Sequence, residues 1–419
     1  MFSVITLAVE FVIKAFLNEL TLGSGKTEAF DIAFIGLFSL AFMYDLGRSK
    51  KLKSLSFPLF LGYIFRVALL FWDIYCRNIY ILPNSGADTE MFYRQSKIYM
   101  NTGYTARGLF PKVMGTIFTY IGDNRLFGQY IIMLFSIVSL IIFALILSEL
   151  QIPNKNKQYA CMIVSLLPNL AIVSVLFLRE SITAMFVTVS FYVFLKWFYN
   201  SNFIYYIMAF ISAFVASAFH SGCAAVAGGY VAIILLYDRN TSSFRLKAKN
   251  IIPTIVLLMI ISFLYVNYGD VLFGKMQGIE SLADVADDQV RGNTSYAPYV
   301  GNSNNPLNML IFTIPRVFFF IASPLPFQWR GLSDIIAFCF SSLFFIYVAW
   351  CDIKYLRSKK ENNRTIIIAL SIIILCTFFV FGWGVANAGT ACRHRDKITT
   401  ICGLLLALTY TRKNKYSKE

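Results

Sequence analysis

Two carboxylates and an arginine follow directly after a long apolar run, within residues 86–94. Asp88 and Glu90 lie two residues apart, so their side chains share a face only if the segment is extended; on a helix Glu90 shares its face with Arg94. A carboxylate here can act as a general base toward a hydroxyl group, or can bind a divalent cation beside phosphate. The alternative for Asp88 is a helix N-cap, because the apolar residue Met91 follows three positions later.

A second charged pair, Arg179 and Glu180, interrupts a stretch that is otherwise apolar from Cys161 to Leu195. Burying a charge in such a stretch is expensive, so the pair predicts either a tight hairpin or a site that faces a cavity. His220 stands where another apolar run ends. We interpret it either as a general base or ligand, or as a histidine at the membrane interface.

The third candidate group is the run Arg393, His394, Arg395 and Asp396, which directly precedes the last apolar run. Guanidinium forks match the geometry of phosphate oxygens, so this group is typical of a phosphate clamp. The alternative is a cluster of interfacial charges. The acidic run at residues 284–288 lacks the spacing of a calcium loop, and the sequence contains no P-loop, dinucleotide fingerprint or zinc-protease motif. We therefore expect no metal site and no cofactor.

The composition indicates which elements position these residues. Hydrophobic residues make up 58% of the 419 positions and charged residues only 14%, with apolar runs from end to end. These proportions are typical of an all-α, polytopic membrane protein that forms one integral domain over residues 1–419. The net charge of +15 falls largely in short loops between apolar runs. It is therefore an orientation signal, and a nucleic-acid partner is not expected.

Length predicts about twelve spans, since a hydrocarbon core about 30 Å thick needs about 20 helical residues. Short loops rich in Lys and Arg stay in the cytoplasm, which places the basic loops near residues 50, 245 and 359 and the C-terminal tail inside. Both termini are then inside. The predicted spans are 1–18, 29–46, 57–80, 126–149, 158–178, 181–199, 203–220, 221–237, 250–268, 331–352, 365–385 and 397–411.

A further apolar run, Leu307 to Ser323, is long enough to cross the membrane. Counting it as a span would place the basic loop that follows it outside. The run and its flank also contain Arg316 and prolines at 315, 324 and 326. We therefore expect a re-entrant or interfacial segment near 307–326 on the outer side. Residues 82–125 and 269–306 are then outer loops.

This topology brings the unusual charges to one face of the membrane. Such a face is suited to handling a charged ligand, and anionic lipid head groups are the natural partners of the arginines. For any single arginine the alternative is snorkelling into the head-group region. The arginines expected on the outer side are Arg94, Arg107, Arg179, Arg291, Arg316, Arg330, Arg393 and Arg395.

The order of these motifs resembles bacterial multi-span glycan-assembly enzymes. The segments that carry the likeness are Ala87 to Tyr93, Gly108 to Pro111, Tyr120 to Asp123, Leu178 to Ser181, and Arg393 to Arg395. The nearest groups are Wzy-type and EpsG-like polysaccharide polymerases, and the C-type glycosyltransferases that use polyprenyl-phosphate sugars. The chain differs from the latter in placing Asp88 after its third apolar run, and it lacks the very large late outer loop of O-antigen ligases.

The resemblance implies an enzyme of the bacterial cytoplasmic (inner) membrane whose active site faces outward. It implies transfer from a polyprenyl-(di)phosphate-linked glycan to a hydroxyl, with Asp88 as base and with Arg179, Arg393 and Arg395 holding the phosphates. Our first hypothesis is a polymerase of lipid-linked repeat units for O-antigen, capsule or exopolysaccharide; the second is a transferase of single sugars. A flippase for the same lipid is the alternative from another class. Expected partners are this lipid, the surrounding membrane lipids and, as an open question, a chain-length regulator.

Overall fold

The computed structural model describes residues 1–19, 24–245, 255, 259, 306–358 and 363–410. The described chain is helical apart from a small antiparallel hairpin, in which β1 (Tyr237–Asp238) pairs with β2 (Ser243–Phe244). The prediction of an all-α fold is therefore confirmed.

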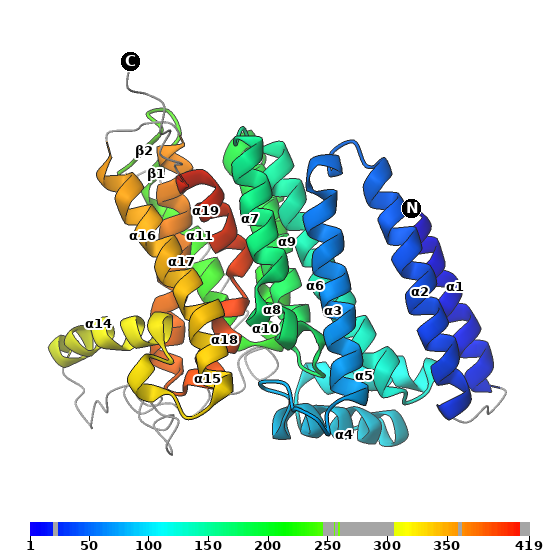
Figure 1. Ribbon diagram of the computed structural model, residues 1–419. Coiled ribbons are helices and arrows are strands. Elements are labelled where there is room, and N and C mark those ends of the chain that lie inside the picture. Colours follow the sequence, from blue (N-terminus) through cyan, green and yellow to red (C-terminus); the bar gives the residue numbers. More distant parts are fainter. Residues whose placement is uncertain (20–23, 246–254, 256–258, 260–305, 359–362, 411–419) are drawn as a thin grey trace.

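Most helices run side by side and form a bundle (Figure 1). Its members are α1 (Phe2–Glu19), α2 (Ser24–Arg48), α3 (Ser56–Tyr75), α6 (Arg125–Glu149), α7 (Asn154–Leu166), α8 (Pro168–Val175), α9 (Glu180–Asn200), α10 (Phe203–Phe219), α11 (Ala224–Leu236), α16 (Leu343–Arg357), α17 (Arg364–Gly384) and α19 (Thr399–Thr409). Short segments connect them: η1 (Lys53–Leu55), η2 (Ser221–Cys223), η3 (Pro326–Gln328), α15 (Leu332–Ala337), the π-helical η4 (Phe338–Ser342) and α18 (Ala388–Asp396).

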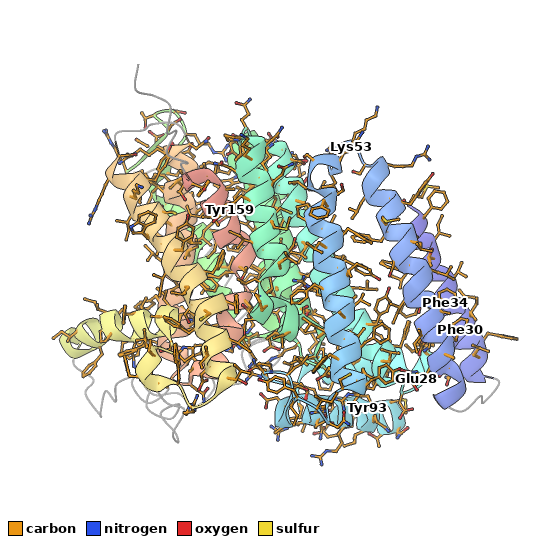
Figure 2. The ribbon with its side chains drawn as sticks, in the orientation of Figure 1. Glu28, Phe30, Phe34, Lys53, Tyr93 and Tyr159 are labelled. Atoms are coloured by element: carbon orange, nitrogen blue, oxygen red, sulfur yellow. The ribbon has the colours of Figure 1, made fainter. Side chains whose placement is uncertain are left out.

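The two ends of the bundle differ. Helix α4 (Ala87–Thr102) lies across one end, which we call the α4 end, while Lys53 and the α2–α3 connection lie at the opposite, basic end (Figures 1 and 2). Helix α14 (Pro306–Ala322) also lies across the bundle, not along it, toward the α4 end. This is the segment near 307–326 for which the sequence predicts a re-entrant or interfacial position.

Within the described residues, six helices are long and apolar enough to cross a membrane, and a seventh span results if the bent pair α7 and α8 counts as one. The protein therefore has the helices of a multi-pass membrane protein. The six are Thr27–Arg48, Lys53–Tyr75, Arg125–Glu149, Glu180–Asn200, Leu332–Arg357 and Arg364–Gly384.

The predicted number of about twelve spans is higher, and the difference comes from identifiable segments. Helices α10, η2 with α11, and α19 are apolar but shorter than a full span, and α1 carries the charges Glu10 and Lys14 in its middle. The predicted span 250–268 lies almost wholly outside the described residues, as does the outer loop 269–306. The larger count stays a prediction.

Residues 82–125, expected to be an outer loop, contain two helices, α4 and α5 (Leu109–Ile121). Each helix is bounded by glycine: α4 ends at Gly103, whose φ of 70° is left-handed, and α5 begins after Gly108 with φ of 81°. The helices pack through Phe92 and Phe110, whose rings lie 5.3 Å apart. A polar helix buries only a narrow stripe, which is why hydropathy alone did not reveal α4.

A buried arginine that the sequence analysis did not single out holds the bundle together at the α7–α8 bend. Pro168 cannot donate a helical hydrogen bond, and the two helices meet at 48°. Arg66 on α3 fills the gap by donating to the Ser165 carbonyl at 2.6 Å and the Gly62 carbonyl at 3.0 Å. Its Nε donates to Ser136 on α6 at 3.2 Å. One buried side chain thus connects α3, α6 and α7.

The first prediction concerns the close approach of α3 and α7 at Gly62. A Cβ atom at this position would lie 2.8 Å from the Ser165 Cβ and 3.0 Å from its carbonyl oxygen. Gly62→Ala should therefore lower the free energy of unfolding by about 1–3 kcal/mol through overpacking. Gly36→Ala on α2 is the matched control, because nothing lies within 4 Å of a Cβ there. Unfolding by SDS in mixed micelles measures both; equal stability of the two variants would contradict the packing.

The second prediction concerns the membrane. Tyr104, 70% exposed beyond α4, and the exposed Lys53 lie near opposite ends of the bundle. Cysteine at Tyr104 should react with an impermeant maleimide in intact cells, and cysteine at Lys53 only after permeabilisation. The parent carries Cys76→Ser and Cys339→Ser, because most other native cysteines are buried. Labelling of both positions in intact cells would contradict a bundle that crosses the membrane.

Candidate functional site

The first turn of α4 meets α18, although 305 residues separate them in the sequence. Arg393 donates from its terminal nitrogen to the Asp88 carboxylate at 2.7 Å. The Asp88 side chain is half exposed and that of Arg393 is largely covered. The structure thus brings together two residues that the sequence analysis proposed separately. Asp88 is not the N-cap of α4; that position belongs to Gly86.

Helix α18 distributes its charged side chains among different neighbours. Asn387 begins the helix by accepting from the backbone N–H of Gly389 at 2.9 Å. Successive residues then point about 100° apart. Arg393 reaches α4, whereas Arg395 reaches α14 and Asp396 accepts from Asn169 on α8 at 2.7 Å.

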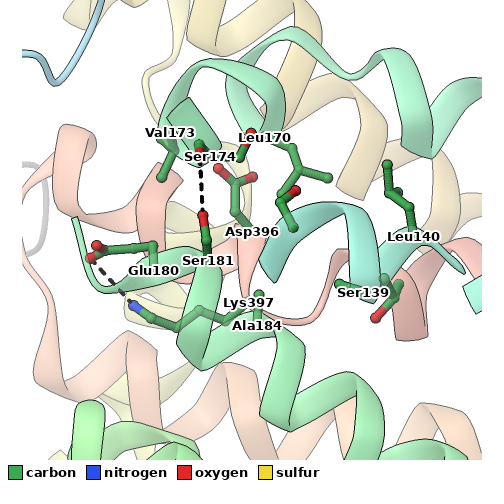
Figure 3. A pocket seen from close by; sticks show the side chains of 12 residues that line it. Ser139, Leu140, Leu170, Val173, Ser174, Glu180, Ser181, Ala184, Asp396 and Lys397 are labelled. Atoms are coloured by element: carbon green, nitrogen blue, oxygen red, sulfur yellow. Dashed lines mark hydrogen bonds and ion pairs between the residues drawn. The ribbon is translucent and has the colours of Figure 1, made fainter. Parts of the chain in front are cut away.

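A buried ion pair lies next to Arg393. Glu180, the first residue of α9, lies 3.9 Å from the Lys397 ammonium, and both side chains are buried. Lys397 also lies 3.2 Å from Nδ1 of His394. Figure 3 shows Glu180 and Lys397 pointing toward each other across the edge of a small cavity. A buried pair of this kind is stable only while both partners are present.

The two histidines of the chain lie in contact. The rings of His220 and His394 are 4.3 Å apart and edge to face. Phe381 on α17 covers both, with ring distances of 5.7 and 5.0 Å. His220 occupies this position because it ends α10. The histidine pair therefore borders the Glu180–Lys397 ion pair through the contact of His394 with Lys397.

The charged residues described so far, Asp88, Glu180, Arg393, Asp396 and Lys397, form with Arg179 one group that we call the Asp88 cluster. Among its cations, Arg179 has the fewest bonded partners. Its guanidinium lies 5.9 Å from the centre of the Phe92 ring on α4. Among the described residues it makes no hydrogen bond and no ion pair, although both Arg179 and Arg393 lie within electrostatic range of Glu180. A partly buried guanidinium without an anion is a ready ligand for phosphate.

Three buried polar atoms of the cluster also lack a hydrogen-bond partner within the described chain: Oε2 of Glu180, Nε of Arg393 and Oδ1 of Asp396. Glu180, Asp396 and Lys397 line a cavity of about 20 Å³, enough for a single water molecule (Figure 3). The other lining residues are Ser136, Ser139, Leu140, Leu170, Val173, Ser174, Ser181, Ala184 and Thr400.

Arg395 has a different role from the one the resemblance implies. It is fully buried and donates to the carbonyl oxygens of Phe320 at 3.0 Å and Ser323 at 2.8 Å, as well as to that of Ile321. These carbonyls belong to the C-terminal turn of α14 and the residue after it, which have no helical partners. Arg395 therefore positions α14 and does not face the Asp88 cluster.

Two other predicted residues, Arg316 and Glu90, bind groups outside the Asp88 cluster. Arg316 on α14 is fully buried and lies 5.3 Å from the centre of the Trp383 ring. Glu90 accepts from Arg125 at 2.8 Å and from Arg77 at 2.5 Å. Hydrogen bonds from Arg125 and then Arg77 hold the pKa of Glu90 below its usual value. Glu90 thus stays ionised at neutral pH and connects α4 to the turn after α3 and to the start of α6.

The remaining predicted residues lie apart from the cluster. Arg94 is exposed on α4, and Arg291 lies outside the described residues. Within the described chain, no group of three or more His, Cys, Asp or Glu side chains is placed to hold a metal ion. No known protein family, curated protein or solved structure matches this chain.

Lys397 and Asn169 belong to the site, but the sequence analysis did not select them. Lys397 and Asp396 continue the charged run that begins at Arg393, and an unbroken run of five polar residues before an apolar helix was the available signal. Asn169 follows Pro168 within an apolar stretch, and a buried amide in such a stretch needs a partner. Its partner on α18 is distant in sequence.

The third prediction separates the two arginines of α18. Arg395→Met leaves several buried carbonyls without donors and should lower the free energy of unfolding by at least about 3 kcal/mol. Arg393→Met removes an ion pair to a half-exposed carboxylate and should cost less than about 1 kcal/mol. Thermal melting in detergent, followed by size-exclusion chromatography, measures both. A larger loss in Arg393→Met than in Arg395→Met would contradict these roles.

Proposed function

We propose that this protein is a membrane glycosyltransferase that moves a glycan from a polyprenyl-(di)phosphate carrier to a hydroxyl group of a second glycan. The observation that carries the proposal is the Asp88–Arg393 pair at the α4 end, beside the uncommitted Arg179. This arrangement offers a carboxylate and guanidinium groups to one ligand, where apolar helices end. A lipid with a charged head group has the matching chemistry.

The cations suit the carrier phosphate. Arg179 and Arg393 are guanidinium groups that bind phosphate through paired hydrogen bonds, and Arg393 retains an unpartnered Nε. Negative charge develops on the leaving phosphate as the glycosidic bond breaks. Cations already held in place, away from bulk water, stabilise this charge more in the transition state than in the ground state.

Asp88 is our proposed base. The acceptor hydroxyl gives its proton to the carboxylate while its oxygen forms a bond to the anomeric carbon. The bond between that carbon and the phosphate oxygen breaks, and its electron pair leaves with the phosphate. Arg393 fixes the carboxylate at 2.7 Å and leaves its outer oxygen available. Glu180 is the second candidate, although its pairing with Lys397 makes a structural role sufficient to explain it.

The proposed site lies on the outer side of a bacterial cytoplasmic membrane. The loop around Lys53 and the last turn of α16, which carries Lys354 and Arg357, lie at the basic end, opposite α4 (Figures 1 and 2). Because basic loops remain in the cytoplasm, the α4 end faces outward. The twelve-span topology with both termini inside belongs to this proposal. Joining of lipid-linked repeat units is the first choice of reaction, and addition of single sugars is the second.

The fourth prediction tests the site by transfer assay with purified protein and lipid-linked oligosaccharide. Asp88→Asn should lower the rate by about 10²- to 10⁴-fold, the usual contribution of a general base. Arg179→Lys should lower it by about tenfold or more, because a point charge cannot replace a paired fork. Lys112→Gln on α5, an exposed cation at the same end, is the control and should leave the rate unchanged.

Gene deletion separates the function classes. A polymerase mutant should display single repeat units of unchanged composition, whereas a mutant in a single-sugar transferase should lack one sugar. Accumulation of complete lipid-linked units inside the cell would indicate a flippase. An unaltered surface glycan under conditions where the gene is expressed would contradict the proposed function. Full transfer activity of Asp88→Asn would instead exclude Asp88 as the base.

A further inference from the structure

A second cavity, of about 410 Å³, opens at the α4 end on the other side of α4 from Arg393. Its volume falls within the range of about 300–1,000 Å³ that is typical of small-molecule sites. Figure 2 labels two of its lining residues, Tyr93 and Glu28, near this end of the bundle. The lining residues are Glu28, Asp73, Ile74, Arg77, Tyr93, Lys97, Asp123, Asn124, Arg125 and Leu126.

The cations of this cavity are already neutralised. Lys97 lies 2.6 Å from the Asp123 carboxylate, and Arg77 and Arg125 both bind Glu90. A phosphate or another anion would have to displace these carboxylates and approach Asp73 and Glu28 as well. The wall is therefore unsuited to an anion, in contrast to Arg179 on the other side of α4.

The same groups suit hydroxyl groups. Asp73 is buried and accepts from Ser85 at 2.6 Å and from Gln129 at 2.8 Å, which fixes its carboxylate. Each carboxylate oxygen can accept a further hydrogen bond, and the Lys97 ammonium has donors beyond the one used by Asp123. Tyr93 is fixed by its own hydrogen bond to the Asp123 carbonyl at 2.6 Å. A rigid wall of paired donors and acceptors matches the vicinal hydroxyls of a neutral sugar.

Helix α4 connects this cavity to the Asp88 cluster. Asp88 and Glu90 are two residues apart on a helix, so their side chains point about 200° apart. Asp88 faces Arg393, while Glu90 binds the arginines of the cavity. The two polar regions thus flank the first turn of α4.

We propose that this cavity binds neutral sugar residues and that, in glycosyl transfer, it is the subsite for the acceptor glycan. The sugar-binding part stands on the cavity alone; the acceptor role rests on the proposed function. The two polar regions bind different parts of the substrates. The carrier phosphate binds at Arg179 and Arg393, and uncharged sugar binds on the Glu90 side of α4.

The fifth prediction uses cavity variants and a matched control. Ile74→Trp fills the cavity from α3, whereas Tyr120→Trp adds the same side chain at a position that is 67% exposed on α5. Asp123→Asn removes the carboxylate charge without changing the shape of the side chain. It is a second test of the cavity in case Ile74→Trp does not fold. Each variant should elute from size-exclusion chromatography like the wild type.

Saturation-transfer NMR with a panel of unmodified neutral mono- and disaccharides measures binding directly. Ile74→Trp and Asp123→Asn should weaken binding of the sugar with the strongest signal by about tenfold, and Tyr120→Trp should not. In the transfer assay the same two variants should raise the KM for acceptor and leave the KM for the lipid donor unchanged. Arg179→Lys should do the reverse.

The outcomes distinguish this inference from the proposed function. Sugar binding that the cavity variants weaken, in a protein without transfer activity, would support the cavity and contradict the glycosyltransferase. Active transfer with an unchanged acceptor KM and unchanged sugar signals in both cavity variants would overturn the cavity inference. Failure of every sugar in the panel to bind the wild type, with unchanged acceptor KM in the variants, would overturn it too.

Discussion

Arg395 is the buried charge on which the arrangement of the α4 end depends. In an apolar bundle the carbonyls at the end of a helix have no water to bind, so another group must supply the donors. Arg395 supplies them for the last turn of α14 through hydrogen bonds to Phe320, Ile321 and Ser323. Fixing α18 against α14 in this way also fixes the direction of Arg393, since the two side chains lie on one short helix. A residue whose side chain binds α14 and not Asp88 thus helps to set the geometry of the Asp88–Arg393 pair.

The same need to satisfy polar groups inside an apolar bundle recurs at Arg66. Pro168 breaks the ladder between α7 and α8, and Arg66 donates to the Ser165 carbonyl at the break. The bend turns α8 so that Asn169 meets Asp396 on α18. These buried charges therefore hold helices together. The candidate site consists of the charges that have no such structural partner, above all Arg179.

Helix α4 shows how one short element can serve two polar regions. Its first turn carries Asp88 and Glu90, and the helical period turns them to opposite sides. Glu90 with Arg77 and Arg125 holds the helix in place, which keeps Asp88 in reach of Arg393. The position of the base and the wall of the larger cavity are therefore set by the same ion pairs. Charges that fasten α4 also neutralise the cavity, which makes it suitable for an uncharged ligand.

Composition and residue order were enough to predict the class of the protein and the residue types of its candidate site. Apolar runs of span length predicted a helical membrane protein, and the placement of Asp88, Arg179 and Arg393 beside such runs marked them as candidates, because charges at these positions are costly. These residues can be recognised as candidates from the composition and the apolar periodicity of the sequence around them. Helix α4 was missed because a polar helix at the surface lacks a strong apolar stripe. Helix α5 is apolar, but its 13 residues are too few to span a membrane.

The partner of each charged side chain follows from how the helices pack. Arg393 and Arg395 are two residues apart and equivalent in sequence terms, yet one binds Asp88 and the other binds the carbonyls of α14. Glu90 and Asp88 diverge in the same way. The reason is that the role of a charge at the end of an apolar helix depends on the group that it binds. The partners here lie far apart in the sequence, as with Asp88 and Arg393. Local pattern predicts that a partner must exist, whereas packing of the helices determines which one it is.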